Sequence, residues 1–232
     1  MRTIGLLGGM SWESTAEYYR AINAGINQAL GGLHSAEIVL YSVDFAPIEQ
    51  RLANGDWTTL GEILVDAARR IQRAGADCLL LCTNTMHKVA PAIELALSIP
   101  LLHIADATAE KLVRDGVKTA GLLGTAATME QNFYKGRLAD RYGLEVIVPE
   151  KEDRRIVHDV IFQELCHGTV RDTSRKHYLD IVGRLSEAGA EAVILGCTEI
   201  AMLIGPTDTK TALYDTTALH VDRAVAWALE VI

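Results

Sequence analysis

The sequence has no long apolar run and no dense cluster of basic residues. No apolar stretch approaches the roughly 20 residues that a membrane-spanning helix needs. The 22 Lys and Arg residues are outnumbered by 30 Asp and Glu, and they form no continuous run. We therefore expect neither a membrane span nor nucleic-acid binding, whereas a small anionic ligand is compatible with a local pocket.

Several signatures of cofactor and hydrolase chemistry are also missing. Two glycine turns follow apolar strands, at Gly8–Ser11 and Gly124–Thr128. Neither has the G-x-G-x-x-G form of a dinucleotide site or the lysine of a P-loop, and no G-x-S-x-G nucleophile elbow occurs in the chain. His87, His103 and His220 are isolated, and Cys78-x-x-x-Cys82 has no second pair to complete a metal site. We expect no nucleotide, no metal and no Ser-His-Asp triad.

Cysteines are few, and the start of the chain lacks a targeting pattern. The segment Met1–Gly5 leads directly into an apolar strand pattern, without the apolar region and cleavage site of a signal peptide. We expect a cytoplasmic protein, and disulfides rarely persist in that compartment. The four cysteines, Cys78, Cys82, Cys166 and Cys197, are then thiols.

The chain does contain short apolar runs that alternate with amphipathic segments. Apolar residues make up 49% of the 232 positions and charged residues 22%, as in a folded protein with a sizeable core. Helical periodicity is clearest over Leu60–Ala74 and Tyr178–Ala188. Alternation with apolar strands predicts an α/β fold with parallel sheets covered on both faces. The predicted strands are Thr3–Leu7, Ala36–Val43, Cys78–Cys82, Leu101–His103, Thr119–Leu123, Leu144–Val148 and Ala192–Leu195.

An internal repeat divides the chain into two related halves. Matching segments occur in the same order at offsets of 114 to 116 positions, with a third and weaker echo. The repeat predicts two pseudo-symmetric α/β lobes with a cleft between them, and ligands of such sheets bind beyond the carboxyl ends of the strands. The pairs are Thr3–Gly8 with Thr119–Gly124, Ala74–Asp77 with Ala188–Glu191, and Asp106–Thr108 with Asp215–Thr217.

The offsets also predict the domain boundaries. We expect the chain to cross between the lobes near Ile104–Asp106 and again near Pro206–Asp215. The C-terminal segment Thr217–Ile232 lies outside the second repeat, so we expect it to return as a helix on the first lobe. The predicted lobes are residues 1–104 plus 212–232, and residues 105–211.

The repeat aligns two polar turns that follow strands. Without gaps, Leu81–Thr85 corresponds to Leu195–Glu199, which makes Thr83 the counterpart of Cys197. Both residues are expected at the mouth of the cleft. Cys82 is one residue out of register and, because strand side chains alternate between faces, is expected to pack inside.

Cys197 is the leading candidate for chemistry. A thiol at a strand end before a helix lies near backbone N–H groups that can lower its pKa well below about 8.5. Thr198 can cap the helix and bind a ligand carboxylate, and Glu199 suits the helix dipole. The alternative interpretation of Cys197 is a buried core thiol.

Two glycine turns are candidate anion cradles. The turns at Gly8–Ser11 and Gly124–Thr128 each follow a strand and precede a helix, where backbone N–H groups can bind a carboxylate. His87, four residues after Thr83, either orients a ligand or caps a helix. The binding candidates of the two turns are Gly9, Met10, Ser11, Thr125 and Thr128.

On these motifs the sequence resembles the aspartate/glutamate racemase family. The resemblance covers nearly the whole chain and rests on Gly8–Ser14 (Gly-Gly-Met-Ser-Trp-Glu-Ser), Thr83–His87 (Thr-Asn-Thr-Met-His) and Gly196–Glu199 (Gly-Cys-Thr-Glu). Within the family it is most similar to bacterial aspartate/glutamate or broad-specificity amino-acid racemases.

The resemblance implies a fold, an assembly and a mechanism. The fold would be two flavodoxin-like domains related by a pseudo-twofold axis, usually as a homodimer, with the active site in the cleft. The reaction would need neither pyridoxal phosphate nor a metal. One thiolate would remove the substrate's α-proton, and an opposite thiol would return a proton to the other face. Cys197, Thr198 and Glu199 match the family's second motif, and Asn84 and Thr85 match its first.

The sequence departs from the family pattern at two positions. Thr83 occupies the place of the first cysteine, and a threonine hydroxyl is a poor base at neutral pH, although it can relay a proton. Cys166 stands where members that act on acidic substrates carry a lysine. Arg51 is the alternative source of positive charge for a side-chain carboxylate.

The sequence is also compatible with other functions of the same fold. A hydantoin racemase, a maleate isomerase or a decarboxylase of malonate-type acids would also protonate a planar enolate. A protein of another class, an amino-acid-binding protein with an impaired active site, is a third reading because the first cysteine is lost. Exchange of the α-proton separates an enzyme from a binding protein.

Overall fold

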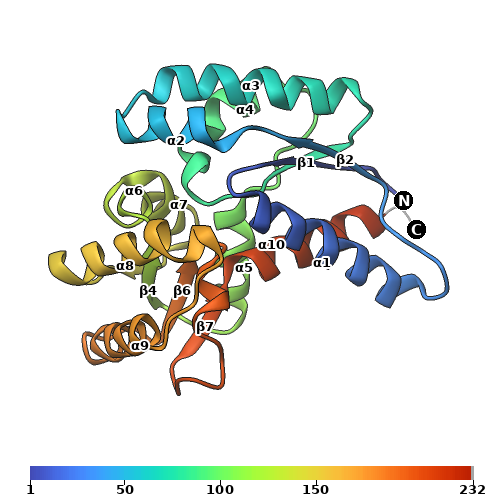
Figure 1. Cartoon of the computed structure of the whole chain (residues 1–232). Helices are drawn as coiled ribbons and strands as arrows, with labels where there is room; N and C mark the ends of the chain where they lie inside the picture. The colour runs from blue at the N-terminus through green and yellow to red at the C-terminus, as the bar shows by residue number, and fades with distance from the viewer. Residues whose placement is uncertain (231–232) are drawn as a thin grey trace. The chain divides into compact units, whose positions relative to one another are not determined.

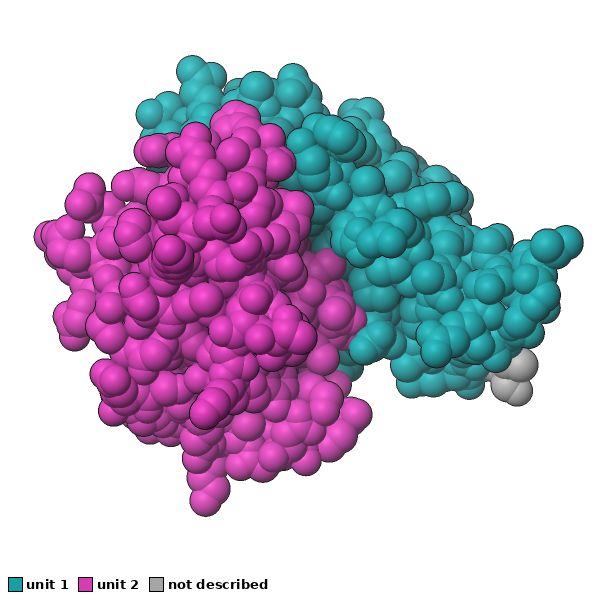
Figure 2. All heavy atoms as spheres, turned by 60° about the horizontal axis from the view of Figure 1, so that its bottom comes forward, with its two compact units in different colours: residues 1–104, 220–232 teal, residues 105–219 magenta. Residues whose placement is uncertain are grey.

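The computed structural model describes residues 1–230 and forms two compact units (Figures 1 and 2). The first unit contains residues 1–104 and the segment that begins at His220, and the second contains residues 105–219. No described helix has the length and apolar character needed to cross a membrane.

The first unit is built on a parallel three-stranded sheet with the order β2-β1-β3. Figure 1 shows α3 on one side of this sheet and α1 on the other. Side-chain caps begin the helices: Ser11 Oγ accepts from Ser14 N at 3.2 Å before α1, and Asp56 Oδ1 accepts from Thr59 N at 3.2 Å before α3. The elements are β1 (Ile4–Gly8), α1 (Trp12–Leu30), β2 (Ile38–Ser42), α2 (Phe45–Ala53), α3 (Trp57–Arg73), β3 (Cys78–Leu81), the 3₁₀ helix η1 (Thr85–Val89) and α4 (Ala90–Ala96).

Alternate strand residues supply two separate core layers in this unit. Leu7 and Leu79 pack with the apolar face of α3, whereas Ile4 and Leu6 pack with α1 and with α10 (Thr216–Leu229). Burial of each such Leu or Ile contributes about 1.5–3 kcal/mol. The α10 side chains in the second layer are Val221, Ala224 and Ala228. The prediction that the C-terminal helix packs on the first lobe is thus confirmed, although its last two expected positions, 231 and 232, lie outside the described residues.

The second unit has a parallel four-stranded sheet with the order β5-β4-β6-β7. One face packs on α8 and α9, where Tyr178 and Ile181 contact a buried layer that includes Leu123 and Val193. The elements are α5 (Ile104–Arg114), which starts in the first unit, β4 (Thr119–Gly124), α6 (Ala126–Glu130), α7 (Asn132–Tyr142), β5 (Glu145–Ile147), α8 (Lys151–Gln163), the 3₁₀ helix η2 (Leu165–His167), α9 (Asp172–Glu187), β6 (Ala192–Gly196), the 3₁₀ helix η3 (Ile200–Met202) and β7 (Ala212–Asp215).

Strand register confirms the internal repeat. Gly5 lies opposite Leu79 in the first sheet, and Gly121 lies opposite Val193 in the second. These two pairs are related by the offsets of 116 and 114 that the sequence shows. The two units are therefore α/β folds of the same topology around their first three strands.

The strand prediction was wrong in two places. Leu101–His103 is not a strand: only Leu101 forms an isolated bridge, with Leu79, because α5 begins at Ile104. Conversely, β7 was not predicted, because this half-exposed edge strand has a short apolar run. Leu213 lies opposite Val193, so β7 takes the place in the second sheet that Leu101 takes in the first.

The division between the units also differs from the prediction at one end. The first division follows Ile104, in the expected segment. The second falls between Leu219 and His220, so residues 212–219 belong to the second unit and not to the first. The reason is that β7 pairs with β6, and Thr216 Oγ1 donates to the carbonyl of Leu195 at 2.9 Å.

Candidate active site

The candidate residues of the first unit follow two neighbouring strands. Met10 and Ser11 come after β1, and Asn84 and Thr85 come after β3, which pairs with β1 in parallel. Ser14 Oγ donates to the carbonyl of Cys82 at 3.5 Å, which joins the start of α1 to the end of β3. The structure thus places these residues at one edge of one sheet.

Glycine is required where the chain leaves β1. A Cβ atom on Gly8 would lie 2.3 Å from Cγ2 of Thr15, and Gly9 has a φ of +95°. The backbone N–H of Gly9 donates to Thr15 Oγ1 at 2.8 Å, so this turn is held by a side chain of α1. Glycine at both positions therefore permits the tight turn that was predicted as an anion cradle.

The candidate residues of the second unit lie at the equivalent edge. Thr125 follows β4 and Cys197 follows β6, and the last residues of these strands, Gly124 and Gly196, are opposite each other. Thr125 Oγ1 accepts from Thr128 N at 3.3 Å and caps α6. Here too the structure brings together residues that are far apart in the sequence.

Thr83 and Cys197 occupy equivalent positions in the two sheets. Each lies two residues after a leucine that pairs with the first strand of its own unit, Leu81 with Leu7 and Leu195 with Leu123. The predicted equivalence of the two positions is therefore confirmed by strand register. Cys82 is completely buried in the core layer beneath α1, as expected.

Cys197 forms a short contact with an acidic neighbour. Its Sγ donates to Oε2 of Glu199 at 3.0 Å, and Thr198 Oγ1 donates to the same oxygen at 2.7 Å. Cys197 is 9% exposed and Glu199 is 4% exposed. The carboxylate thus accepts two hydrogen bonds from the turn in which it lies.

The expected lowering of the Cys197 pKa was wrong. Burial, followed by the negative charge and hydrogen bond of Glu199, raises the pKa of the Cys197 thiol well above its ordinary value. The helix expected to follow the turn is only the short 3₁₀ segment Ile200–Met202, which offers little dipole to oppose these effects. In this environment Cys197 is a thiol and a proton donor to Glu199.

The other cysteines have different surroundings. Burial raises the pKa of Cys78 to about 12, and it also raises the pKa of Cys82. Both belong to an apolar core layer, which is the environment of an inert thiol. Cys166 is half-buried in η2 and packs against the core layer that contains Cys197.

Arg51 lies in the last turn of α2, the helix that follows β2. Its Nη1 donates to the carbonyl of Pro47 at 2.8 Å, one helical turn earlier. The side chain is half-buried, so the structure gives Arg51 a local helical contact within the first unit.

Three buried histidines of the first unit lie close together, although they are scattered in the sequence. The rings of His87 and His103 are 4.4 Å apart between centroids, and those of His87 and His220 are 6.1 Å apart. His87 Nδ1 contacts the carbonyl of Thr83, so its ring serves the turn after β3. The contacts that join His220 to Tyr18 and to His87 could not be predicted, because no local pattern links positions so far apart. Within residues 1–230, no group of three or more His, Cys, Asp and Glu side chains is arranged to hold a metal ion.

Comparison with known proteins gives consistent matches over nearly the whole chain. The model of the Asp/Glu/Hydantoin racemase family matches residues 7–224. The broad specificity amino-acid racemase RacX of Bacillus subtilis (strain 168) is 23% identical over 229 residues, which cover 96% of each chain. Two crystal structures are similar: a candidate Asp/Glu racemase from Yersinia pestis (50% identity, 99% and 100% coverage, TM-score 0.93) and an aspartate racemase homologue from Pyrococcus horikoshii OT3 (32% identity, 99% and 100% coverage, TM-score 0.84).

Proposed function

Because the chain belongs to the Asp/Glu/hydantoin racemase family, we propose that it is an amino-acid racemase in which Cys197 exchanges the α-proton of the substrate without a cofactor. The substrate is aspartate, glutamate or a wider range of amino acids. The observation that carries the proposal is the thiol of Cys197 at the carboxyl edge of its sheet, 3.0 Å from the carboxylate of Glu199.

In the proposed mechanism, Cys197 and Glu199 share one proton. Transfer of the thiol proton to the carboxylate leaves a thiolate, which removes the α-proton of the L-enantiomer. The electron pair of the broken C–H bond moves into the substrate carboxylate and gives an enolate-like intermediate. Cys197 is then a thiol again and Glu199 is a carboxylic acid. This completes the general-base half of the reaction.

The second half returns a proton to the opposite face. We assign this step to Thr83, whose hydroxyl passes on a proton from water. The hydroxide that remains is neutralised by the proton on Glu199, so the site regains its starting charge. Each turnover thereby replaces the substrate's α-proton by one from solvent.

An α-proton is a very weak acid, so a base alone is not sufficient. Hydrogen-bond donors have to stabilise the negative charge that develops on the substrate carboxylate. We assign this role to the backbone N–H groups of Met10 and Ser11 and of the turn at Thr125–Thr128, with the side chains of Asn84 and Thr85. The N–H of Gly9 already donates to Thr15 Oγ1 and the hydroxyl of Thr198 already donates to Glu199, so these two residues shape the turns of the site. We assign the charge for an acidic side chain of the substrate to Arg51, since a cysteine such as Cys166 offers no positive charge.

The proposal is tested by exchange of the α-proton. Each common L- and D-amino acid is incubated with the protein in D₂O; loss of the α-proton signal is followed by NMR and racemisation by chiral chromatography. We expect exchange with at least one amino acid, at a rate that EDTA, added pyridoxal phosphate and NAD leave unchanged. A protein that binds an amino acid and never exchanges its α-proton would be a binding protein and not a racemase.

We further propose a cytoplasmic homodimer. All four cysteines are free thiols, which fits a reducing compartment. Trp12 and Tyr19, seven residues apart on α1, are 68% and 52% exposed, and aromatic side chains are enriched at protein interfaces. Sedimentation analysis should give twice the chain mass for the native protein, and a Trp12→Ser, Tyr19→Ser variant should shift towards the monomer. Recovery of the protein with the membrane or extracellular fraction would contradict the location.

A further inference from the structure

We propose that His87 is a positioning residue whose imidazole ties the carbonyl of Thr83 to the backbone amide of Ile104. The link joins the turn after β3 to the point at which the chain leaves the first unit. Its kinetic consequence rests on the proposed racemase function, whereas the link itself rests on contacts within the first unit.

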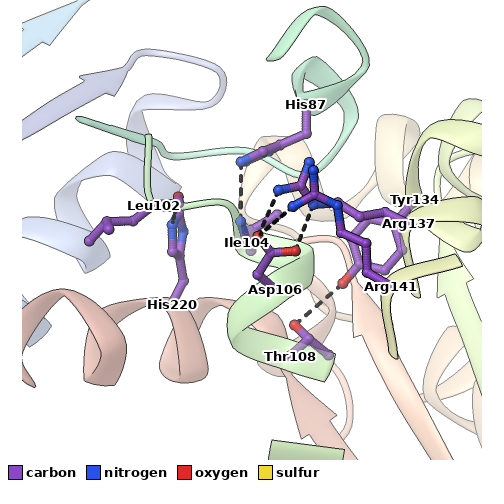
Figure 3. A network of polar contacts seen from close by, with 9 residues as sticks. All are labelled: His87, Leu102, Ile104, Asp106, Thr108, Tyr134, Arg137, Arg141 and His220. Carbon is purple, nitrogen blue, oxygen red and sulfur yellow. Dashed lines mark hydrogen bonds and ion pairs between the residues drawn. The ribbon is translucent and has the colours of Figure 1, made fainter. Parts of the chain in front are cut away.

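The contacts of the ring determine its tautomer. Nδ1 lies 2.8 Å from the carbonyl oxygen of Thr83. The amide of Ile104 donates to Nε2 at 3.3 Å (Figure 3). A carbonyl only accepts and a backbone N–H only donates, so Nδ1 carries the proton and Nε2 carries the lone pair. His87 is 1% exposed, and in this arrangement it is neutral.

The 3₁₀ geometry of η1 explains why a side chain is used here. The amide of His87 donates to the carbonyl of Asn84 at 3.1 Å, three residues back. The ring of His87 then supplies the donor for the Thr83 carbonyl. In the second unit, the carbonyl of Cys197 accepts instead from the amide of Ile200 at 3.1 Å. The offset of 114 makes Ala201 the counterpart of His87, and alanine has no polar side chain.

The segment that His87 binds is held by other polar side chains as well. His220 Nε2 donates to the carbonyl of Leu102 at 2.7 Å, and its Nδ1 accepts from the hydroxyl of Tyr18 at 2.9 Å. Burial lowers the pKa of His220 to about 4, which favours its neutral form. Beyond Ile104, Asp106 forms two contacts of 2.6 Å with Arg137 (Figure 3). The anchor that His87 uses is therefore a fixed point of the chain.

A fixed anchor matters because proton transfer depends on atomic positions. The carbonyl of Thr83 belongs to the same residue as the hydroxyl that we assign to proton return, so the ring of His87 restrains the backbone that carries this hydroxyl. A misplacement of about 1 Å can lower a catalytic rate by about 100-fold. Loss of the Nδ1 contact should act on kcat more than on KM, because it moves a reacting group and removes no substrate contact.

Two variants separate the two bonds of the ring. In His87→Asn, the amide nitrogen replaces Nδ1 and can still donate to Thr83. In His87→Gln, the amide oxygen reaches the place of Nε2 and can accept from Ile104, but the donor to Thr83 is lost. We expect His87→Gln to lower kcat by about tenfold or more with little change in KM, and His87→Asn to retain more of the wild-type kcat.

Tyr18→Phe is the matched control. It removes a buried hydroxyl from the same histidine cluster and leaves in place both hydrogen bonds of the His87 ring and the bond from His220 to the carbonyl of Leu102. We expect a lower Tm and an unchanged kcat for folded protein. If all three variants lower Tm and leave kcat unchanged, His87 has a structural role only and the proposal is overturned.

A readout independent of activity completes the test. ¹⁵N NMR of the imidazole should show a neutral ring protonated on Nδ1. Hydrogen exchange should accelerate at the amide of Ile104 in His87→Asn and at the amide of residue 87 in His87→Gln. A ring protonated on Nε2 refutes the link. If no variant and no wild-type protein exchanges an α-proton, the racemase proposal fails, and these NMR measurements still decide the link between Thr83 and Ile104.

Discussion

Cys197 and Glu199 are joined by a hydrogen bond of 3.0 Å from Sγ to Oε2, within a single turn of the chain. The bond keeps a proton between the two side chains and opposes formation of a free thiolate. The resting residue is therefore a protonated thiol with its proton acceptor already in place. Reactivity of this cysteine is expected to depend on Glu199 as much as on its own position.

Replacement of the thiol by a hydroxyl tests the role of Cys197. We expect Cys197→Ser to abolish exchange of the α-proton, because serine has a far higher pKa, and to leave Tm close to that of the wild type. Cys78→Ala is the control, since Cys78 is a core thiol whose loss should lower Tm and spare kcat. α-Proton exchange and thermal unfolding are measured on all three proteins. Near-normal exchange by Cys197→Ser would show that Cys197 is only a core thiol.

Removal of the charge on Glu199 tests the shared proton. We expect Glu199→Gln to lower the pKa of Cys197, because the carboxylate no longer opposes the thiolate. The rate of alkylation by iodoacetamide, followed against pH, should therefore rise at lower pH than in the wild type. Racemisation should still fall, since the acceptor for the thiol proton is gone. An unchanged alkylation profile would mean that Glu199 does not govern this thiol.

The difference between Thr83 and Cys197 predicts unequal exchange of the two enantiomers. If Cys197 is the competent base, solvent deuterium should enter the L-amino acid much faster than the D-amino acid. The overall equilibrium constant still equals one, because enantiomers have equal free energy, so exchange is measured and not the final composition.

A second thiol should correct this asymmetry. We expect Thr83→Cys to accelerate exchange from the D-enantiomer by about 100-fold, the usual contribution of a positioned base. Cys82→Ala in the same background serves as control and should not alter the ratio of the two rates. Equal exchange of both enantiomers by the wild type would assign a base to the Thr83 side and contradict the proposed roles.

Substitution of Gly124, the last residue of β4, tests the close packing of the turn that follows this strand. A Cβ atom on Gly124 would lie 2.9 Å from the carbonyl of Gly196 and 3.2 Å from Cβ of Thr128. We expect Gly124→Ala to lower the free energy of unfolding by about 1–3 kcal/mol. Gly183→Ala, in an exposed and uncrowded position of α9, should instead raise it by about 0.5–1 kcal/mol. Urea unfolding of both variants gives the two values, and equal signs would contradict the close approach at Gly124.

The sequence predicted the architecture well where a local pattern reports on it. The helical period over Leu60–Ala74 corresponds to α3. The repeat of strand, glycine and helix corresponds to two sheets with the same register. The edge strand β7 was missed and Leu101–His103 was overestimated; both are short segments next to the third strand of their sheets. Pairing at a sheet edge depends on the neighbouring strand, which the segment itself does not encode.

The candidate site was predictable in its positions and not in its electrostatics. The offset of 114 placed Cys197 and Thr83 at equivalent strand ends. The direction of the pKa shift of Cys197 was wrong, because it depends on burial and on the rotamer that brings Glu199 to the thiol. The bond between Tyr18 and His220 spans 202 positions and has no local signal at all.

The path of the chain through the two units has a consequence for the order of folding during synthesis. The second unit is one continuous segment, whereas the first is completed by α10, whose side chains cover Ile4, Leu6 and Tyr18. A ribosome makes this helix only after the whole second unit. The second unit can therefore fold around its core first, while one face of β1 stays exposed until α10 has been synthesised.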